Sequence, residues 1–448
     1  MKRLVASDRI QKPWPSAAVL AAVGAICCLV VIACREDSDP ATAWDGTVRD
    51  SAGIEIVENF GRPLWPEGPG WEFTQDLRIG AVDGPPEYEF GHITGFQVLS
   101  DGRIVIVDAM AYKVRFFSPE GVHERSVGRQ GQGPGELGTG SHLLLRGPGD
   151  TLLVDDGGAR RIHVLAPDGT WLETFSRLPK DGYEGGYWSG SSRTGRLTSL
   201  HSPLRQSDGT LTDTLDIVLE RDVHGGIVDT IARLPSRYTF YRGDAGTFRR
   251  YYNAAWWHMP WGEGHVIARS DRYRFLWYGP DGQLRRIMGL AREPTPITEQ
   301  DRAVFMERWE EYLQERSVPV DRWSEIKSAI SFADSYPPYC TFRPGPAGTL
   351  LVERVRPARA LDSEKRSRLD VNQQYVPPGS SEWDVFDSEG HYLGGVVIPE
   401  TEWTPGSPRP TRFFRDPAAD TWYMYSIWSD ELGVEYIVRW RIDGRMPA

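Results

Sequence analysis

The chain has 448 residues, which is enough for one large all-β domain or for two to three average domains. Its 47 Gly, 33 Pro, 17 Trp and 18 Tyr favour many short strands joined by tight turns over a bundle of helices. The formal net charge is -11, and the sequence has no extended block of Lys and Arg. Because phosphate binding needs a basic surface, the composition argues against a nucleic-acid partner.

The first 33 residues have the layout of a secretory signal peptide. Basic residues precede an apolar stretch over residues 17–33, and a polar segment follows at once. The last four residues of this region, Val31-Ile32-Ala33-Cys34, resemble the lipobox of bacterial lipoproteins. The resemblance implies cleavage before Cys34 and lipidation of Cys34. A plain signal peptide and an uncleaved membrane anchor are the alternatives, and the apolar stretch lies at the short limit for spanning a bilayer.

All three alternatives place the remaining chain outside the cytoplasm. We therefore expect an exported, membrane-anchored lipoprotein that faces the periplasm or the cell exterior. The expected organisation is a signal peptide at 1–33, a lipidated tether at 34–45 and a folded body at 46–448. The tether is short and polar, and it shows no periodicity.

A repeated hairpin motif runs through the body. Residues 112–128 align without a gap with residues 273–289, and both share a Tyr, a Pro, an acidic-Gly turn and a closing Gly. Each copy predicts a strand, a turn and a second strand. Two further strands precede several copies, so one unit has four strands in roughly 40 to 50 residues, the spacing of propeller blades. Further copies lie at residues 160–176, 217–234 and 383–398.

Three segments resemble the NHL-repeat proteins, which are six-bladed β-propellers. These segments are DGRIVIVD (101–108), YKVRFFSPEG (112–121) and GRQGQGPGEL (128–137). The resemblance implies that the body is one all-β, six-bladed β-propeller. It implies no particular activity, because propellers carry many unrelated functions.

The two ends of the body predict how the ring closes. Hairpins near residues 113, 161, 217, 274, 383 and 436 correspond to six blades. The last unit stops at a turn and has no outer strand. We expect the N-terminal strand at residues 53–57 to supply that strand, because pairing it with the last blade would remove an open sheet edge.

Two insertions interrupt the repeats, an aromatic one at 236–261 and a helical one at 298–333. Thr298 is expected to cap a helix that has Asp301 in its first turn. Each insertion connects the outer strand of one blade to the inner strand of the next, so both should lie near one mouth of the central channel. Concave mouths lined by aromatic residues are common ligand sites. The ligand-binding candidates in the aromatic insertion are Tyr241, Tyr252, Trp256, Trp257 and His258.

Packing of the insertion onto the blades is the alternative role for each of these aromatic residues. A lone His is weak evidence for a base or a metal ligand, and we assign no catalytic residue. Asp108 and Asp155 follow strands at positions we take as equivalent in two blades. They either hold Ca²⁺ in the channel or accept backbone N–H groups in turns. Cys340 is expected to be a small buried residue rather than a nucleophile.

Two functions fit these features. The first is a monomeric binding or scaffold protein of the cell envelope that holds a peptide, a glycan or a protein partner at the channel mouth, without a cofactor. The alternative is a metal-dependent hydrolase or lyase that acts in the channel. That enzyme would need at least three carboxylate, Asn or His side chains converging on the axis, and an apolar or arginine-lined channel would argue against it.

Overall fold

A computed structural model describes most of the body. The described residues are 44–65, 70–139, 142–176, 187–191, 197–201, 215–222, 224, 226–235, 240–243, 246–328, 330–367, 369, 371, 379–399 and 411–447. The signal peptide and nearly all of the tether, including Cys34, lie outside these residues. Residues 44–448 form one compact unit. None of the described helices has both the length and the apolar character needed to cross a membrane.

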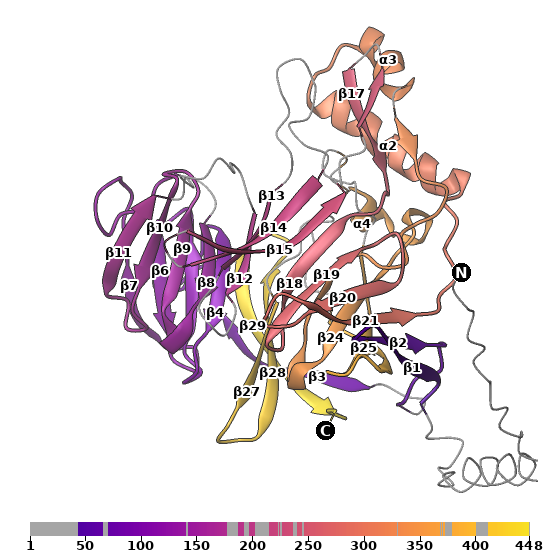
Figure 1. Ribbon diagram of the computed structural model, residues 1–448. Helices are drawn as coiled ribbons and strands as arrows, with labels where there is room; N and C mark the ends of the chain where they lie inside the picture. Colours follow the sequence, from indigo (N-terminus) through magenta and orange to yellow (C-terminus); the bar gives the residue numbers. More distant parts are fainter. Residues whose placement is uncertain are drawn as a thin grey trace, which may run out of the picture. The chain divides into compact units, whose positions relative to one another are not determined.

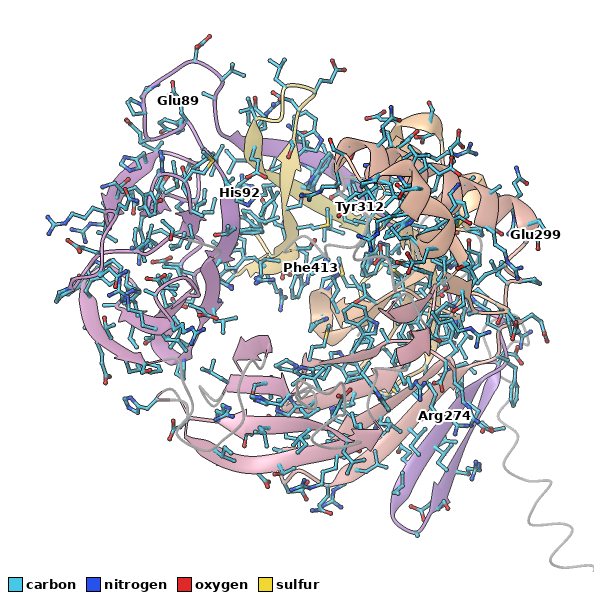
Figure 2. The ribbon with its side chains drawn as sticks, turned by 90° about the horizontal axis from the view of Figure 1, so that it is seen from above. Glu89, His92, Arg274, Glu299, Tyr312 and Phe413 are labelled. Atoms are coloured by element: carbon cyan, nitrogen blue, oxygen red, sulfur yellow. The ribbon has the colours of Figure 1, made fainter. Side chains whose placement is uncertain are left out.

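The described residues form six antiparallel blades around a centre (Figure 2). Blade 1 has β4 (Ile93–Val98), β5 (Ile104–Asp108), β6 (Lys113–Phe117) and β7 (His123–Val127). Blade 2 has β8 (His142–Arg146), β9 (Leu152–Asp156), β10 (Arg161–Leu165) and β11 (Trp171–Ser176). Blade 3 has β12 (Tyr187–Ser191), β13 (Leu197–His201), β14 (Leu215–Arg221) and β15 (Ile227–Pro235).

The second half of the ring repeats this pattern. Blade 4 has β18 (Trp256–Trp261), β19 (Gly264–Arg269), β20 (Arg274–Tyr278) and β21 (Leu284–Leu290). Blade 5 has β23 (Phe342–Pro344), β24 (Leu350–Val355), β25 (Gly379–Phe386) and β26 (Tyr392–Val397). Blade 6 has β27 (Thr411–Asp416), β28 (Thr421–Ser429), β29 (Glu435–Gly444) and β3 (Trp71–Ile79). The predicted six-bladed β-propeller is confirmed.

The first strand of each blade lies innermost in the ring. β8 contacts both β4 and β12, β18 contacts both β12 and β23, and β27 contacts β4. The cores lie between blades, so the second strands are covered on both faces. All five residues of β5 are therefore buried, as are all five of β9. Burial on both faces explains why these strands have nearly continuous apolar sequences.

An N-terminal strand closes the ring, as predicted, but it is β3 and not the strand expected at residues 53–57. β3 pairs antiparallel with β29, from Ile79 opposite Ile437 to Trp71 opposite Gly444, and so supplies the missing outer strand of blade 6. The expected strand at residues 53–57 lies instead in β2 (Ile54–Asn59), which pairs parallel with β21 of blade 4. β1 (Gly46–Ser51) pairs with β2, so the sheet of blade 4 has six strands.

The buried residues of β2 and β3 show which core each strand packs into. Trp71 and Ile79, at the two ends of β3, enter the cores on the two sides of blade 6. Val57 of β2 instead enters the core between blades 4 and 5. Both strands begin with alternating apolar and polar residues, and only their long-range partners distinguish them.

The insertions lie on one face of the ring. β16 (Phe240–Gly243), β17 (Gly246–Tyr251) and β22 (Ser331–Phe332) form a small sheet beside α2 (Glu299–Glu315) and α3 (Trp323–Ser328), and Figure 1 shows α2, α3 and β17 together above the blades. The last six residues of the aromatic insertion belong to blade 4, because they form its innermost strand β18. The remaining short helices are η1 (Pro148–Asp150), η2 (Val320–Arg322), η3 (Pro346–Gly348), η4 (Ala358–Ala360) and α4 (Ser363–Ser367).

The predicted cap of α2 is confirmed. The Thr298 hydroxyl accepts a hydrogen bond from the Asp301 backbone N–H, and the Asp301 carboxylate accepts one from the Thr298 backbone N–H at 2.9 Å. These reciprocal bonds satisfy two backbone donors that a helix start otherwise leaves without partners. The helix packs on a core of its own, separate from the cores between the blades. This insertion core includes Tyr251, Tyr252, Ile297, Val304, Phe305, Tyr336, Ala358 and Leu361.

Candidate functional site

A pocket of about 510 Å³ lies where the insertions meet blade 4. Its wall comes from four segments: the chain that enters β18, the turn between β19 and β20, the chain that leaves β21 and the chain that follows β22. The lining residues are Arg250, Tyr252, Asn253, Ala254, Ser270, Asp271, Arg272, Tyr273, Leu290, Ala291, Arg292, Pro294, Ala333, Asp334, Ser335, Tyr336, Pro337 and Pro338.

Strand order brings these segments to the same face. In an antiparallel blade, the turn between the second and third strands and the connection from the outer strand to the next blade lie at one end. Hydrogen bonds then fix the segments: Ala255 N–H donates to Ser270 Oγ at 2.9 Å, and Ser270 N–H donates to the Ala255 carbonyl at 3.0 Å. Tyr252 turns the chain from β17 toward β18 with φ of 53°, a left-handed conformation that is uncommon for an aromatic residue.

Most charges around the pocket already have partners. Asp334 lies 3.4 Å from Arg250, and Asp271 lies 3.7 Å from Arg269. Arg292 donates from Nη2 to the Asp384 carboxylate at 3.0 Å, and its guanidinium lies 5.4 Å from the centre of the Tyr273 ring. Each of the two acidic residues of the pocket therefore has an arginine side chain within 4 Å.

Asp384 is the centre of a buried polar network between blades 4 and 5. Besides Arg292, its carboxylate accepts hydrogen bonds from the Tyr273 hydroxyl at 2.6 Å, from Arg354 Nη2 at 2.7 Å and from the Tyr392 hydroxyl at 3.1 Å. Burial and then the Asp384 charge raise the pKa of Tyr392 to about 12, and the same causes raise the pKa of Tyr273 well above its usual value. Both hydroxyls therefore remain donors at neutral pH.

Besides the buried Tyr252 hydroxyl, three polar side chains of the pocket make no hydrogen bond or ion pair within the described part of the chain. They are Asn253, Arg272 and Ser335. Arg272 is exposed, and the other two are half-buried. The pocket therefore offers a guanidinium, an amide and a hydroxyl to a ligand.

The five residues predicted to bind a ligand do not come together. Tyr252 lines the pocket but is 0% exposed, and its ring packs against Phe305 and Tyr336 in the insertion core. The other four lie elsewhere: Trp256, Trp257 and His258 are half-buried on β18, and Tyr241 is on β16, with a side chain outside the described residues.

The arginines of the pocket were missed by the sequence analysis. One signal for Arg272 was present in the repeats. When Tyr273 is aligned with Tyr112, Arg272 occupies the position of Ala111. A guanidinium at a turn position where another blade has a methyl group marks a local departure from the repeat.

The described inner strands carry arginines. Arg343 lies on β23 and Arg412 on β27, and Arg412 Nε donates to Gln97 Oε1 on β4 at 3.1 Å. Burial, and then the charge of Arg343, lower the pKa of Arg412 to about 10. Burial raises the pKa of Glu353 on the neighbouring strand β24 to about 7, against the opposing effect of Arg343 and Arg356.

The guanidinium of Arg343 lies 4.6 Å from the centre of the Trp383 ring, and that of Arg412 lies 5.9 Å from the centre of the Phe96 ring. Both therefore pack against aromatic residues of the blades. Among the described residues, no three His, Cys, Asp or Glu side chains lie close enough together to hold a metal ion. Cys340 is buried, as expected, and burial raises the pKa of its thiol well above the usual value.

Asp108 has a structural role at the end of β5. Its carboxylate accepts hydrogen bonds from the backbone N–H groups of Gly91, His92 and Ala111 and pairs with Arg115 at 2.9 Å. The equivalent residue in blade 2 is Asp156 at the end of β9, and not Asp155.

Asp156 repeats the arrangement of Asp108. It accepts hydrogen bonds from the backbone N–H groups of Gly138 and Ala159 and pairs with Arg161. In each of the two blades, an Asp at the end of the second strand thus holds the connecting turns through backbone N–H groups.

Comparisons with known proteins add solved structures of low similarity. No family model matches the chain, and no curated protein matches it. A member of the DUF4221 family from Bacteroides vulgatus has 11% identity and a TM-score of 0.45, covering 85% of this chain and 100% of its own. Virginiamycin B lyase from Staphylococcus aureus has 9% identity and a TM-score of 0.36, covering 83% of this chain and 99% of its own. A Bacteroides fragilis protein designated as exported has 12% identity and a TM-score of 0.44, covering 87% of this chain and 100% of its own. At such similarity no residue role is carried over to this chain.

Proposed function

We propose that this protein is an exported binding protein of the cell envelope, tethered by a lipid on Cys34, that holds a partner in the pocket between the insertions and blade 4. The proposal keeps the predicted class of function. It moves the site from the mouth of the channel to one side of the same face. The observation that carries it is the pocket itself, which blade 4 and the inserted segments build together.

The pocket chemistry favours binding over catalysis. The described lining contains no His, Cys or Glu side chain. Ser270 is fully buried, and its hydroxyl oxygen accepts the Ala255 N–H, so it is poorly placed to act as a nucleophile. What the lining does offer is hydrogen-bonding groups that have no partner among the described residues, which is what recognition of a ligand needs.

The export part of the proposal rests on the sequence. Export is indicated by the basic residues at the start, the apolar stretch and the lipobox-like Val31–Cys34 segment. The tether of 34–45 would then hold the propeller close to the membrane surface, where it can meet partners of the envelope.

A crosslinking experiment tests this function. A photoreactive amino acid placed at Ser335 should capture the partner in living cells, because Ser335 lines the pocket. The matched control is the same amino acid at Ala419, an exposed position in the hairpin between β27 and β28, at the end of the molecule opposite α2 (Figure 1). A defined adduct at Ser335 and none at Ala419 supports the proposal. Equal labelling at both positions, or none at Ser335, would overturn it.

A further inference from the structure

The ligand class follows from the charges and hydrogen-bonding groups of the pocket. We infer that the pocket binds a peptide segment that carries a carboxylate, with Arg272 receiving the carboxylate and the Asn253 side chain pairing with the peptide backbone. This inference rests on the proposed function, because it names the ligand of the same site.

The charge balance of the pocket selects an anionic ligand. Asp334 is paired with Arg250, and Asp271 lies beside Arg269. Asp384 compensates Arg292 from inside the protein. Arg272 then remains as the lining cation without an ion pair in the described part of the chain. A chain with a formal net charge of -11 thus presents an uncompensated positive charge here, and one carboxylate would neutralise it.

The uncharged polar side chains of the pocket favour a peptide as the ligand. A side-chain amide offers a donor and an acceptor together, which matches the N–H and C=O groups of an extended backbone. Asn253 is half-buried at the pocket wall and makes no side-chain hydrogen bond within the described residues. The Ser335 hydroxyl lines the same pocket and can donate or accept a further bond.

The aromatic residues argue against a glycan. Sugar rings usually pack on exposed faces of Tyr or Trp. The pocket tyrosines are instead nearly covered: Tyr252 is 0% exposed, Tyr336 is 1% exposed and Tyr273 is 7% exposed. The apolar part of the wall includes Pro294 and Pro338, which are not buried and can pack against the side chains of a peptide.

Arg292 is a positioning residue in this arrangement. Its guanidinium is held by Asp384 and lies over the Tyr273 ring, so it is fixed before any ligand arrives. A fixed second guanidinium raises the positive potential in the pocket without losing side-chain freedom when the ligand binds.

Two matched peptide pools test the inference. Each pool contains N-acetylated hexapeptide amides with Glu at the third position in one pool and Gln at that position in the other, and the remaining residues are random uncharged types. Immobilised mature protein is exposed to an equal mixture of both pools, and the retained peptides are counted by mass spectrometry. The best Glu peptide is then labelled, and its Kd is measured by fluorescence polarisation.

Three variants distinguish an effect of the lost charge from an effect of lost folding. Arg272→Gln removes the guanidinium at an exposed position that has no ion pair with any described residue. Arg274→Gln is the matched control, because Arg274 (labelled in Figure 2) is also exposed, lies two residues away and is not part of the pocket lining. Asn253→Ala tests the contact with the backbone. Unchanged thermal unfolding of all three variants confirms that they are folded.

The inference requires the wild-type protein and Arg274→Gln to retain Glu peptides in excess over Gln peptides. Arg272→Gln should abolish that excess and raise the Kd of the Glu peptide about fivefold. Asn253→Ala should weaken both pools. Equal retention of the two pools by the wild type overturns the inference that the ligand carries a carboxylate. Retention of neither pool overturns the peptide class. The crosslink at Ser335 is measured independently, so either result leaves the proposed binding function to be judged by its own test.

Discussion

Arg292 and Asp384 connect the pocket to the interior of the propeller. Arg292 follows the outer strand of blade 4, whereas Asp384 lies on β25 in blade 5, and their side chains are 3.0 Å apart. Asp384 is 0% exposed, and Arg354 of blade 5 shares its carboxylate. The contact between two blades and the shape of the pocket therefore depend on the same carboxylate.

Replacing Asp384 should destabilise the whole propeller. Asp384→Asn keeps the volume but removes the charge that compensates Arg292 and Arg354, and it leaves two tyrosine hydroxyls with a weaker acceptor. Loss of one member of a buried ion pair costs about 3 kcal/mol. We expect a clear fall in the urea midpoint, measured by intrinsic fluorescence. Asp83→Asn is the control, because Asp83 is exposed and makes no described contact. If both variants unfold at the same midpoint, the network does not support the fold.

Glu353 should make stability fall as the pH rises. Its pKa is about 7 in the folded protein because of burial, compared with an ordinary value of 4.5. Between these values the unfolded chain ionises while the folded protein keeps the proton, so the free energy of unfolding decreases from pH 4.5 to pH 7. The contribution is fully present below pH 4.5 and is lost above pH 7.

Glu353→Gln removes this titration. The variant should be more stable than the wild type by about 3 kcal/mol at pH 8, and the two should agree at pH 4.5. Urea unfolding at the two pH values measures the difference. A variant that is equally stabilised at both pH values would show that the charge of Glu353 is not responsible.

The cap of α2 should contribute measurably to stability. Thr298→Ala removes the hydroxyl that bonds with Asp301 and should cost about 1 kcal/mol. Thr298→Ser keeps the hydroxyl and should stay close to the wild type. Thermal unfolding of the three proteins, followed by circular dichroism, provides the comparison. Equal losses in the Ala and Ser variants would assign the effect to packing of the threonine methyl group.

Cys34 should determine where the protein is found. Cys34→Ala removes the residue that the lipobox-like segment presents for lipidation, so we expect unprocessed or soluble precursor to accumulate. Membrane fractionation and intact mass measure both properties. Fractionation and mass identical to those of the wild type would reject the lipoprotein hypothesis. Cys340→Ala is the control, because this cysteine is buried in the body and lies far from the signal segment in the chain.

The sequence was sufficient for features that depend on short-range interactions. The hairpins repeat a strand, a tight turn and a strand within about 17 residues, so the six blades could be counted from the sequence. The cap of α2 joins Thr298 to Asp301, three residues away, and was predicted for the same reason. Burial of Cys340 followed from its residue type.

The tertiary structure decided everything that joins distant segments. β2 and β3 both begin with alternating apolar and polar residues, and only the pairing of Ile79 with Ile437 shows which one closes the ring. The pocket likewise assembles Asn253, Arg272 and Arg292 from three separate connections of blade 4. A local pattern specifies that a strand or a turn forms. Its partner is specified by burial and by charge compensation across the fold, and those exist only once the blades have packed together.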